Sequence, residues 1–509
     1  MTTKGTTKAE NLIADIVVIG GGGAGLAAAL AAAENGCKSI IVLEKAGSAA
    51  GSTVMAHDIF GAESPVQKRQ GVDARKDDLF KIAMEWAHWT RINPRLVRAF
   101  IDKSGDTIDW LEKKGLNFEL IQFYPNQVPL VRHSVIGHGA ALMKTLRNGC
   151  LEAGIKILTR TPAKKILRDG KGKITGVVAK TKEGQELTIT AGSVIVASGG
   201  YGNNKEMLKK YCPYYHNNMT YDGPANNTGD GILMATEIGT AMAGLGTCNL
   251  HGPFLTPGSP SEVMKLDTKG FDGNQLRITL WLLAWEPETI WVNKNGQRFV
   301  DEGYNLSFFS YGNAVALQPD GISYTLFDSN TLKTMEEQGF IRPGAANRAV
   351  WLPVAAATPM PGLEREVNKQ VDNDNLKISS SWDEIAGWMG ARPAVLEATV
   401  DEYNAACDQH HDGLFAKEPR YLRPLRTPPY YAIKGHVAIC DAYGGIKINE
   451  NMEALDTDDN PIPGLYAAGS TAGCWESEKY CERLTGHLVG WALNSGRIAG
   501  EKAVEYLSQ

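Results

Sequence analysis

Residues 15–45, DIVVIGGGGAGLAAALAAAENGCKSIIVLEK, decide the fold of this chain. An apolar segment at 15–19 predicts a strand, which leads into a run of glycines, an alanine-rich helix and a second apolar segment at 39–45. Strand, glycine turn, helix and strand in this order make a βαβ unit, the building block of a parallel sheet. The stretch therefore predicts an α/β fold.

The glycines of this turn have the spacing Gly20-x-Gly22-x-x-Gly25. Gly20 permits a tight turn, Gly22 lets the backbone approach a pyrophosphate, and Gly25 allows the helix to pack closely on the strand. The helix N-terminus supplies amide donors and the positive end of a dipole. Glu44 ends the second strand, where its carboxylate can accept hydrogen bonds from a ribose. The alternative is a glycine-rich turn that binds no nucleotide.

An acid at Glu44 disfavours a 2′-phosphate, so the pattern leaves FAD and NAD as the candidate cofactors. The chain has 509 residues, enough for about two to three domain-sized units. Its formal net charge of −5 offers no broad basic surface, so nucleic acid is not an expected partner.

The cysteines indicate a reducing compartment. The eight of them are scattered, with no C-x-x-C pair, no haem attachment motif and no iron–sulfur spacing. The N-terminal residues are polar and lack the apolar core of a secretion signal. No run of 18 apolar residues exists, so we expect a soluble, cytoplasmic protein without a membrane span.

The composition and the predicted secondary structure of the chain change twice. Up to residue 247 a helical region at 76–114 and strand-like segments dominate, whereas residues 248–440 are rich in Pro, Trp and loop-forming residues. From 441 a sheet-like pattern returns, and residues 486–507 predict a final helix. We therefore predict a discontinuous cofactor domain, 1–247 and 441–509, interrupted by a second domain at 248–440. The strand-like segments before residue 248 are 155–158, 174–180, 186–189 and 193–200.

Several sequence blocks occur in a fixed order along nearly the whole chain. They are AGSTVMAHDIFGAESP (50–65), SVIVASGGYGNN (193–204), TGDG (228–231), VNKNGQRFVDE (292–302), PIPGLYAAG (461–469) and Arg483 followed by GWALNSGRIAGEKA (490–503). Together they resemble the fumarate reductase/succinate dehydrogenase flavoprotein family, which also contains urocanate reductases, aspartate oxidases and ketosteroid dehydrogenases.

The resemblance implies a Rossmann-type FAD-binding domain interrupted by an α+β capping domain. It also implies that the flavin is bound without a covalent link, because Ser52 and Thr53 occupy the region where some relatives carry the linking histidine. The helix N-terminus at 486–488 would face the N1/C2=O edge of the flavin and stabilise the reduced form. The FAD contacts implied by the resemblance are Gly20, Gly22, Gly25, Glu44, Ser52, Thr53, Ala163, Ser198, Gly199, Leu488 and Ser470, where relatives carry an acid on the ribityl chain.

In this family a hydride moves between flavin N5 and the β-carbon of a double bond conjugated to a carbonyl, and an acid handles the α-proton. His251 lies at the family's spacing after Thr228 for a substrate-binding histidine. Arg483 lies at the family's spacing before Arg497 for an arginine that clamps a carboxylate or carbonyl. The alternatives are a capped surface histidine and a structural ion pair.

Three departures argue against fumarate as the substrate. The arginine proton donor of fumarate reductases is Leu332 here, and Glu302, which starts their proton relay, has Asn305 in place of its arginine partner. Their second carboxylate-binding histidine falls where Cys440 and Asp441 stand. A dicarboxylate would therefore lack its cationic clamps.

The proton donor must then come from another residue. Tyr443 is the first candidate, because tyrosine serves as the acid or base in the ketosteroid branch of the family. The insert WESEKYCER at 475–483 is longer than in fumarate reductases and would alter the pocket mouth. An aromatic pocket for a bulky substrate could form from Trp281, Trp285, Trp291 and Trp475, although such residues more often build cores. Weaker candidates for the acid, each of which could instead be a satisfied core group, are Tyr304, Tyr480, Asp441, His57 and Glu478.

The sequence thus predicts an FAD-dependent oxidoreductase that acts on a C=C/CH–CH bond adjacent to a carbonyl or carboxylate, as an enoate or enone reductase. The expected catalytic residues are Arg483, His251, Tyr443 and Glu302, and no metal site is expected. Electrons would come from an external reductant or a partner redox protein. The alternatives are a ketosteroid-type desaturase and a flavin electron-transfer subunit of a larger complex.

Overall fold

The predicted βαβ unit forms and organises the first sheet. β1 (Glu10–Ile19), α1 (Gly23–Glu34) and β2 (Ile40–Leu43) follow one another, and β1 pairs in parallel with β2. The prediction of an α/β fold is confirmed. The structure, a computed structural model, describes residues 10–122, 129–255, 280, 282–303, 308–341, 359–369 and 374–509.

The sheet built around β1 has the strand order β16-β17-β9-β1-β2-β6, with β8 pairing β9 and β7 pairing β8. β1, β2, β9 and β17 are parallel, and Ile19, Leu43, Val196 and Ala467 lie in register near their ends. The segments that follow these strands therefore emerge at one edge, where ligands of such sheets bind. The further strands are β6 (Lys156–Leu158), β7 (Ala163–Arg168), β8 (Ile174–Lys180), β9 (Glu186–Val196), β16 (Glu453–Leu455) and β17 (Pro461–Ala467).

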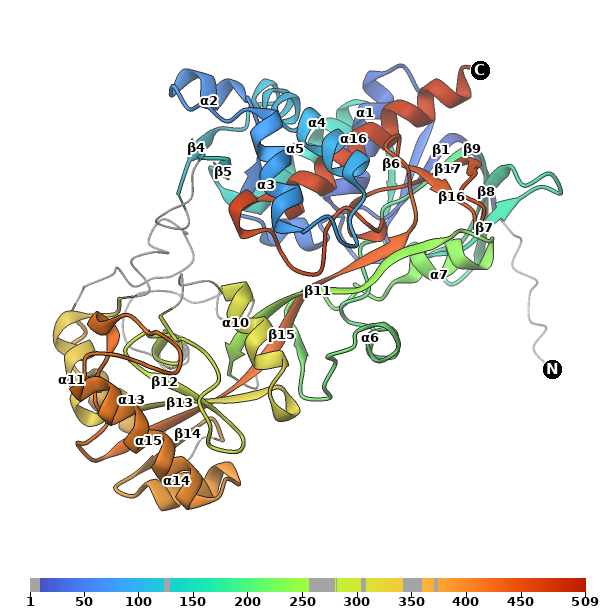
Figure 1. The fold of residues 1–509 in the computed structure, drawn as a ribbon. Helices are drawn as coiled ribbons and strands as arrows, with labels where there is room; N and C mark the ends of the chain where they lie inside the picture. Colours follow the sequence, from blue (N-terminus) through green and yellow to red (C-terminus); the bar gives the residue numbers. More distant parts are fainter. Residues whose placement is uncertain are drawn as a thin grey trace, which may run out of the picture.

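The helix α1 packs against this sheet and against the C-terminal helix α16 (His487–Leu507) in the upper lobe of Figure 1. A Cβ atom added at Gly496 would lie 2.2 Å from the carbonyl oxygen of Ala24, and one at Gly500 would lie 2.2 Å from that of Ala28. The backbones of the two helices are thus in contact, which only glycine permits. This contact fixes α16 relative to the glycine turn.

Further helices and a small antiparallel sheet complete this lobe. The sheet has the order β3-β5-β4, and β3 joins it to the first turn of α16 through the Phe60 amide, which donates to the Gly486 carbonyl at 3.0 Å. These elements are η1 (Ser52–Met55), β3 (Asp58–Phe60), α2 (Pro65–Arg69), α3 (Lys76–Trp86), α4 (Pro94–Lys113), β4 (Phe118–Leu120), β5 (Arg132–Val135), α5 (His138–Glu152), α7 (Asp230–Glu237), η4 (Gly469–Thr471) and η5 (Glu482–Leu484).

The second lobe is built on a mixed sheet of order β10-β15-β13-β12, to which β11 and β14 add by pairing with β15. Helices cover this sheet in the lower part of Figure 1. The elements are α6 (Lys205–Tyr211), β10 (Thr220–Tyr221), β11 (Met242–Phe254), β12 (Ile290–Asn293), α10 (Phe308–Ala316), η2 (Pro319–Gly321), β13 (Ile322–Asp328), α11 (Ser329–Gln338), α13 (Leu363–Asn368), β14 (Leu376–Ser379), α14 (Trp382–Met389), α15 (Pro393–Asp408), η3 (Pro419–Tyr421) and β15 (Tyr430–Ile446).

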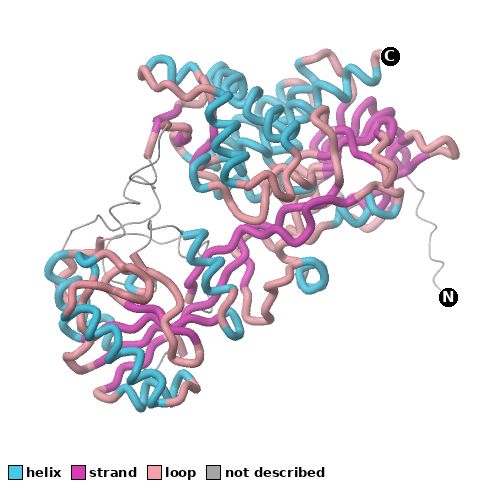
Figure 2. Tube along the Cα trace, viewed as in Figure 1, coloured by secondary structure: helices cyan, strands magenta, loops and turns pink. Residues whose placement is uncertain are grey.

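The two lobes are joined by the antiparallel pair β11 and β15, the long magenta strands that cross the middle of Figure 2. Their ladder runs from Met242 opposite Ile446 to Phe254 opposite His436. The predicted domain borders at 247/248 and 440/441 fall inside this ladder, since Cys248 lies opposite Ala442. The division into domains stays a prediction, and in space the two strands belong to both lobes.

Two local predictions differ from the structure. The predicted segment 186–189 and the first part of 193–200 form one strand, β9, which ends at Val196, because the long strand β1 pairs with it between Glu10 and Ile19. The helical region 76–114 is broken into α3 and α4, where His88, Trp89 and Arg91 have positive φ. The break between α3 and α4 is not marked by a glycine in the sequence.

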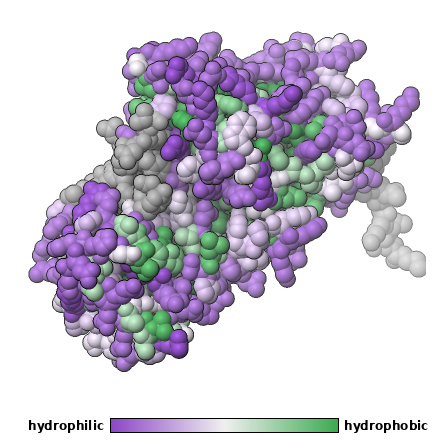
Figure 3. Space-filling view, in the orientation of Figure 1, coloured by the Kyte–Doolittle hydropathy of each residue, from purple (hydrophilic) through white to green (hydrophobic). Residues whose placement is uncertain are grey.

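The face of the molecule in Figure 3 is mostly hydrophilic, with smaller hydrophobic areas on the lower lobe and near the junction of the lobes. Among the described residues, no helix combines the length and the apolar character needed to cross a membrane.

The contact between α1 and α16 gives a direct test. We expect Gly496→Ala to lower the thermal unfolding temperature, because its new methyl group meets the backbone of Ala24, and overpacking costs about 1–3 kcal/mol. The matched control is Gly387→Ala in α14, where a Cβ meets nothing within 4 Å. The control should gain up to about 1 kcal/mol from helix propensity. Equal effects of the two changes would contradict the close backbone contact.

Candidate active site

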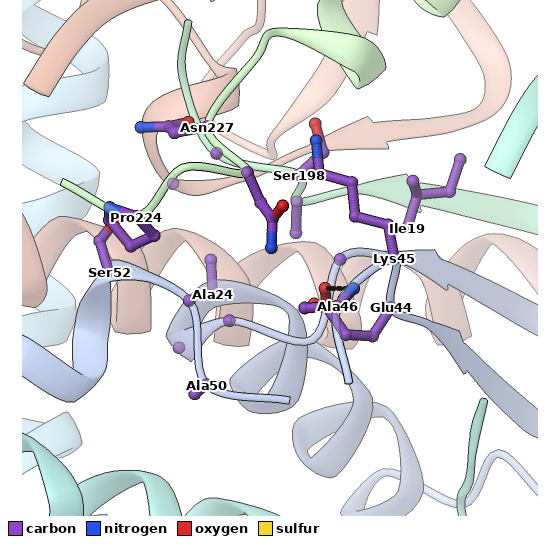
Figure 4. A pocket seen from close by; sticks show the side chains of 18 of the residues that line it. Ile19, Ala24, Glu44, Lys45, Ala46, Ala50, Ser52, Ser198, Pro224 and Asn227 are labelled. Atoms are coloured by element: carbon purple, nitrogen blue, oxygen red, sulfur yellow. Dashed lines mark hydrogen bonds between the residues drawn. The ribbon is translucent and has the colours of Figure 1, made fainter. Parts of the chain in front are cut away.

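A cavity of about 340 Å³ opens where the parallel strands β1, β2, β9 and β17 end. Figure 4 shows Glu44 and Lys45 at one end of it, and Ser52 and Pro224 at the other. We call these the adenosine end and the flavin end. Of the predicted FAD contacts, those that line the cavity are Gly20, Gly22, Glu44, Ser52, Thr53, Ala163, Ser198, Gly199 and Ser470.

The glycine turn has the shape that a pyrophosphate needs. Gly20 has φ +111°, and a Cβ there would lie 2.3 Å from the Ala197 carbonyl oxygen. At Gly22 the nearest atom to an added Cβ is the Gly51 Cα at 3.7 Å, so this residue borders open space. Gly25 does not line the cavity, and a Cβ there would lie 1.9 Å from the Gly20 carbonyl oxygen. Gly25 thus allows the close packing of helix on strand that its position predicted.

The adenosine end carries a fixed carboxylate. Glu44 is buried and accepts hydrogen bonds from the Gly21 amide at 2.9 Å and the Ala46 amide at 2.7 Å. A carboxylate has further lone pairs, so Glu44 can still accept from a ribose hydroxyl. Beside it Lys45 reaches Asp230 and Thr228, both at 2.7 Å, which ties β2 to α7 across this end. The residues present therefore fit a dinucleotide.

At the flavin end a chain of polar side chains surrounds Asp441 on β15. Ser470 donates to its Oδ2 at 2.7 Å, and Asn227 donates to its Oδ1 at 3.2 Å. Asn227 also donates to the Tyr221 hydroxyl at 2.6 Å, and Tyr221 bonds to Ser52. The Oδ1 of Asn227, a buried residue that lines the cavity, has no hydrogen-bond partner among the described residues. A hydroxyl of the ribityl chain would satisfy it.

At the position where the resemblance implies an acid in relatives, Ser470 on η4 therefore contacts the carboxylate of Asp441 on β15. Burial raises the pKa of Asp441 to about 6, against the hydrogen bonds from Ser470, the Ala442 amide and Asn227, which lower it. The sequence placed Asp441 among weak proton-donor candidates. Its contact with Ser470 could not be read, because the two residues are 29 positions apart.

Tyr443, the first proton-donor candidate, is buried on β15 next to Trp475, with ring centroids 5.2 Å apart. Burial, with smaller effects of Asp441, Cys440, Glu476 and Tyr480, raises the pKa of Tyr443 well above its usual value. Its hydroxyl has no hydrogen-bond partner in the described part of the chain. Buried hydroxyl groups normally have a hydrogen-bond partner, so a bound ligand is a plausible partner for the Tyr443 hydroxyl.

His251 lies on β11, and its Nδ1 is 3.9 Å from Asp222. Burial lowers the pKa of His251 to about 4, so the ring is neutral at neutral pH. Its ring stacks on Phe254, with centroids 6.0 Å apart. The predicted substrate-binding histidine is therefore an uncharged donor and acceptor.

The two other predicted catalytic residues lie in different surroundings. Arg483 is exposed on η5, beside Glu482, which accepts from Ser310 of α10 in the second lobe at 3.3 Å. Glu302 is fully buried and pairs with Arg298 at 3.0 Å and Lys417 at 3.2 Å. These cations hold the pKa of Glu302 below its usual value despite burial. Its fixed charge favours a structural role.

The weaker candidates divide between surface and core. Glu478 is exposed and 3.7 Å from Arg91, whereas Tyr480 lies at the start of α16, with its ring 4.3 Å from that of His487. The His57 ring lies 5.0 Å from that of His138, and burial lowers the pKa of His57 to about 4. Trp285 and Trp291 pack on Tyr311 in the core of the second lobe, and Trp475 stacks on Trp491 beside α16. Trp285 and Trp291 therefore do not form one pocket wall with Trp475. Leu488 does not line the cavity, and Tyr304 and Trp281 lie outside the described residues.

The sequence did not predict the buried pair of Glu476 and His487 at the start of α16, in which the His487 Nε2 contacts a carboxyl oxygen of Glu476. The only signal was the unusual length of the 475–483 insert. No group of three or more potential metal ligands occurs within the described residues.

The model of the FAD binding domain family matches residues 15–483. The vinyl phenol reductase of Lactiplantibacillus plantarum is 31% identical over 508 residues, which covers 99% of both chains. The open conformation of a flavocytochrome c3 fumarate reductase has a TM-score of 0.71 and 25% identity, covering 98% of this chain and 79% of that one. The 3-ketosteroid Δ1-dehydrogenase of Sterolibacterium denitrificans shares the fold, with a TM-score of 0.76, 18% identity, and 97% and 99% coverage.

The glycine turn predicts a variant that folds but does not bind its cofactor. The backbone of Gly22 is extended, and its Cβ position is open, so Gly22→Val should fold normally. The side chain would fill the place of the pyrophosphate, and we expect FAD affinity to fall at least tenfold, about 1.4 kcal/mol. Flavin content after purification and FAD titration measure this. Gly413→Val, at an open position, is the control. Unchanged affinity in Gly22→Val would refute the assignment.

The raised pKa of Asp441 predicts a pH effect on stability. The folded state holds this proton more tightly than the unfolded state, whose pKa is about 3.9. The stability that it contributes is therefore lost as the pH rises from about 4 through about 6. Asn stays neutral at all these pH values, so the unfolding temperature of Asp441→Asn should rise relative to that of the wild type as the pH increases from about 4 to about 6. Exposed Asp401→Asn is the control. A difference that does not change with pH would contradict the shift.

Proposed function

The chain belongs to the FAD binding domain family and is an FAD-dependent oxidoreductase of the fumarate reductase-like kind, and from this premise we propose that it reduces a conjugated C=C bond in an uncharged substrate. The double bond would be conjugated to an accepting group, either a carbonyl group or, as in a vinyl phenol, an aromatic ring. Fumarate, a dicarboxylate, is not the proposed substrate.

The observation that carries this proposal is the charge around His251 and Asp441. His251 is neutral and its Nδ1 lies 3.9 Å from Asp222, and Asn249, two residues before it, lies opposite Asp441 in the ladder of β11 and β15. Burial raises the pKa of the Cys440 thiol, and the negative charges of Asp222 and Asp441 raise it further. A carboxylate bound beside His251 would be repelled by these two acids, at a high cost in a buried site.

The relative from L. plantarum supports the same class. Its name gives vinyl phenol as its substrate, and a vinyl phenol carries a hydroxyl group instead of a carboxylate. A neutral imidazole has one N–H donor and one acceptor nitrogen, so His251 can bind either a hydroxyl or a carbonyl. It offers no charge to balance a carboxylate.

The residues of the chain would share the remaining work. FAD, when bound, supplies the hydride. Tyr443, protonated at neutral pH because of its raised pKa, would give the proton to the carbon next to the accepting group. Arg483 lies exposed near the contact between Glu482 and Ser310, where the two lobes meet, and would reach the substrate when the lobes close. An external electron donor and a cytosolic location stay predictions.

Two other functions remain on the same fold. A ketosteroid-type desaturase would run the chemistry backwards, and the shared fold with the ketosteroid dehydrogenase keeps it open. An electron-transfer subunit would need no substrate groups. The buried Tyr443 hydroxyl, with no partner in the described residues, favours an enzyme with a substrate or cofactor group at that position.

A matched pair of substrates tests the proposal. FAD in the purified protein is photoreduced without oxygen and mixed in a stopped-flow instrument with 4-vinylphenol, 4-vinylbenzoate, an enone or fumarate. We expect the uncharged compounds to reoxidise the flavin at least about 100-fold faster than the carboxylates, which corresponds to about 2.7 kcal/mol. Fumarate reacting fastest would overturn the proposal.

Two controls complete this experiment. Tyr443→Phe should keep its FAD but slow the reaction about 10²–10⁴-fold if the tyrosine gives the proton. A flavin that no small molecule reoxidises, but that a redox protein does, would indicate the electron-transfer subunit. If a saturated ketone reduces the oxidised flavin faster than an enone reoxidises the reduced flavin, the protein is the desaturase.

A further inference from the structure

Asn227 is not among the residues that the sequence predicted for FAD, yet it lines the cofactor cavity. It lies in the connection 222–229, which leaves β10 of the second sheet and leads into α7. Figure 4 shows it near Pro224 at the flavin end. Only 6% of the residue is exposed, so its polar atoms need partners inside the protein or on a ligand.

The contacts of Asn227 fix the orientation of its side chain. Its backbone amide donates to the Pro224 carbonyl at 3.0 Å, and its carbonyl accepts from the Asn203 amide at 2.9 Å. Its Nδ2 donates to the Tyr221 hydroxyl at 2.6 Å and to the Asp441 Oδ1 at 3.2 Å, which uses both N–H groups. A reversed carboxamide would point its oxygen at the Asp441 carboxylate, so these partners identify the nitrogen.

The carboxamide oxygen is therefore the atom that remains for a ligand. It has no hydrogen-bond partner among the described residues. A Cβ added at Gly199 would lie 2.8 Å from it, and Gly199 lines the cavity. Because a carbonyl oxygen only accepts, the ligand must bring a donor. The hydroxyl groups of the ribityl chain of FAD are donors of this kind.

Both partners of the Asn227 nitrogen belong to the second sheet. Tyr221 is the last residue of β10 and lies opposite Ile439 in the parallel ladder of β10 and β15. The next amide, that of Asp222, donates to the Ile439 carbonyl at 2.8 Å. Asp441 lies two residues after Ile439 on the same strand, β15. The side chain of Asn227 thus connects the cavity to this ladder.

The Tyr221 side chain is itself held in place. A Cβ added at Gly202 would lie 2.3 Å from a ring carbon of Tyr221, and one added at Gly223 would lie 2.2 Å from its hydroxyl oxygen. The hydroxyl also bonds to Ser52 on η1, which lines the cavity. A phenol confined in this way keeps the carboxamide of Asn227 in one orientation.

We propose that Asn227 binds FAD by accepting a hydrogen bond from a ribityl hydroxyl, and that this bond couples FAD binding to the ladder of β10 and β15. Coupling of this kind is reciprocal, so bound FAD stabilises the ladder and the ladder strengthens FAD binding. The proposal rests on FAD binding by the family and not on the identity of the substrate. Tyr221 acts through Asn227 and is a positioning residue.

The test uses analogues of the cofactor and no substrate. Wild-type protein, Asn227→Ala and Tyr221→Phe are loaded with FAD or with analogues that each lack one hydroxyl group of the ribityl chain. Flavin release after dilution is followed by fluorescence. In the wild type, we expect one analogue to dissociate about fivefold faster than FAD, the size expected for one neutral hydrogen bond.

The variants show whether Asn227 accepts this bond. In Asn227→Ala the same analogue and FAD should dissociate at equal rates, because the acceptor is gone. In Tyr221→Phe the difference should shrink, because the carboxamide loses one of the two partners that orient it. This variant keeps its ring between the two glycines, so it remains informative if Asn227→Ala does not fold.

Hydrogen exchange at the Asp222 amide measures the coupling, because this amide is bonded within the ladder. In the wild type, replacing FAD by the same analogue should speed its exchange about twofold or more. In Asn227→Ala the two cofactors should give the same exchange rate. The matched control is Asn217→Ala, an exposed asparagine in the turn before β10, which should behave like the wild type in both measurements.

Each result decides the proposal. If every analogue leaves the wild type at the rate of FAD, or if the difference persists in Asn227→Ala, Asn227 does not bind the ribityl chain and the inference fails. If release changes but exchange at Asp222 does not, Asn227 binds FAD without the coupling, which overturns the second half. None of these results depends on which substrate the enzyme reduces.

Discussion

The structure depends on one steric constraint, the contact between backbones at the glycines of α1 and α16. Gly25 brings the first helix against the turn at Gly20, and Gly496 brings α16 against Ala24. Each contact leaves no room for a Cβ atom. Because α16 is held there, its start lies beside β3, where the Phe60 amide donates to the Gly486 carbonyl, and Ala492 of α16 lines the cavity. The cofactor site is thus built by packing, before any polar contact is considered.

Burial then decides the chemistry of the polar groups that this packing encloses. His251 loses its charge and Asp441 holds its proton more tightly, although isolated residues of these types would be ionised differently. His251 therefore carries no positive charge at neutral pH. The neutral state of His251 is the reason why we propose an uncharged substrate instead of a dicarboxylate.

The strands β11 and β15 connect this chemistry to the second lobe. One ladder carries His251, Asp441 and Tyr443 on strands that continue into the lower sheet. Movement of that lobe would therefore be transmitted to these side chains through backbone hydrogen bonds. By contrast, Glu302 lies within the second lobe, held by Arg298 and Lys417, so its charge stabilises that lobe from inside.

The sequence by itself determined the βαβ unit and a dinucleotide site, because glycine spacing and strand ends are local and place Gly22 and Glu44 directly. The choice of FAD and the other predicted cavity residues came from the family resemblance of the later sequence blocks. Only the tertiary structure decided what depends on distant partners. It placed Asp441 against Ser470, buried Tyr443 without a partner among the described residues, and joined Glu476 to His487. Charge and protonation depend on burial and on neighbours, and a chain reveals neither until it is folded.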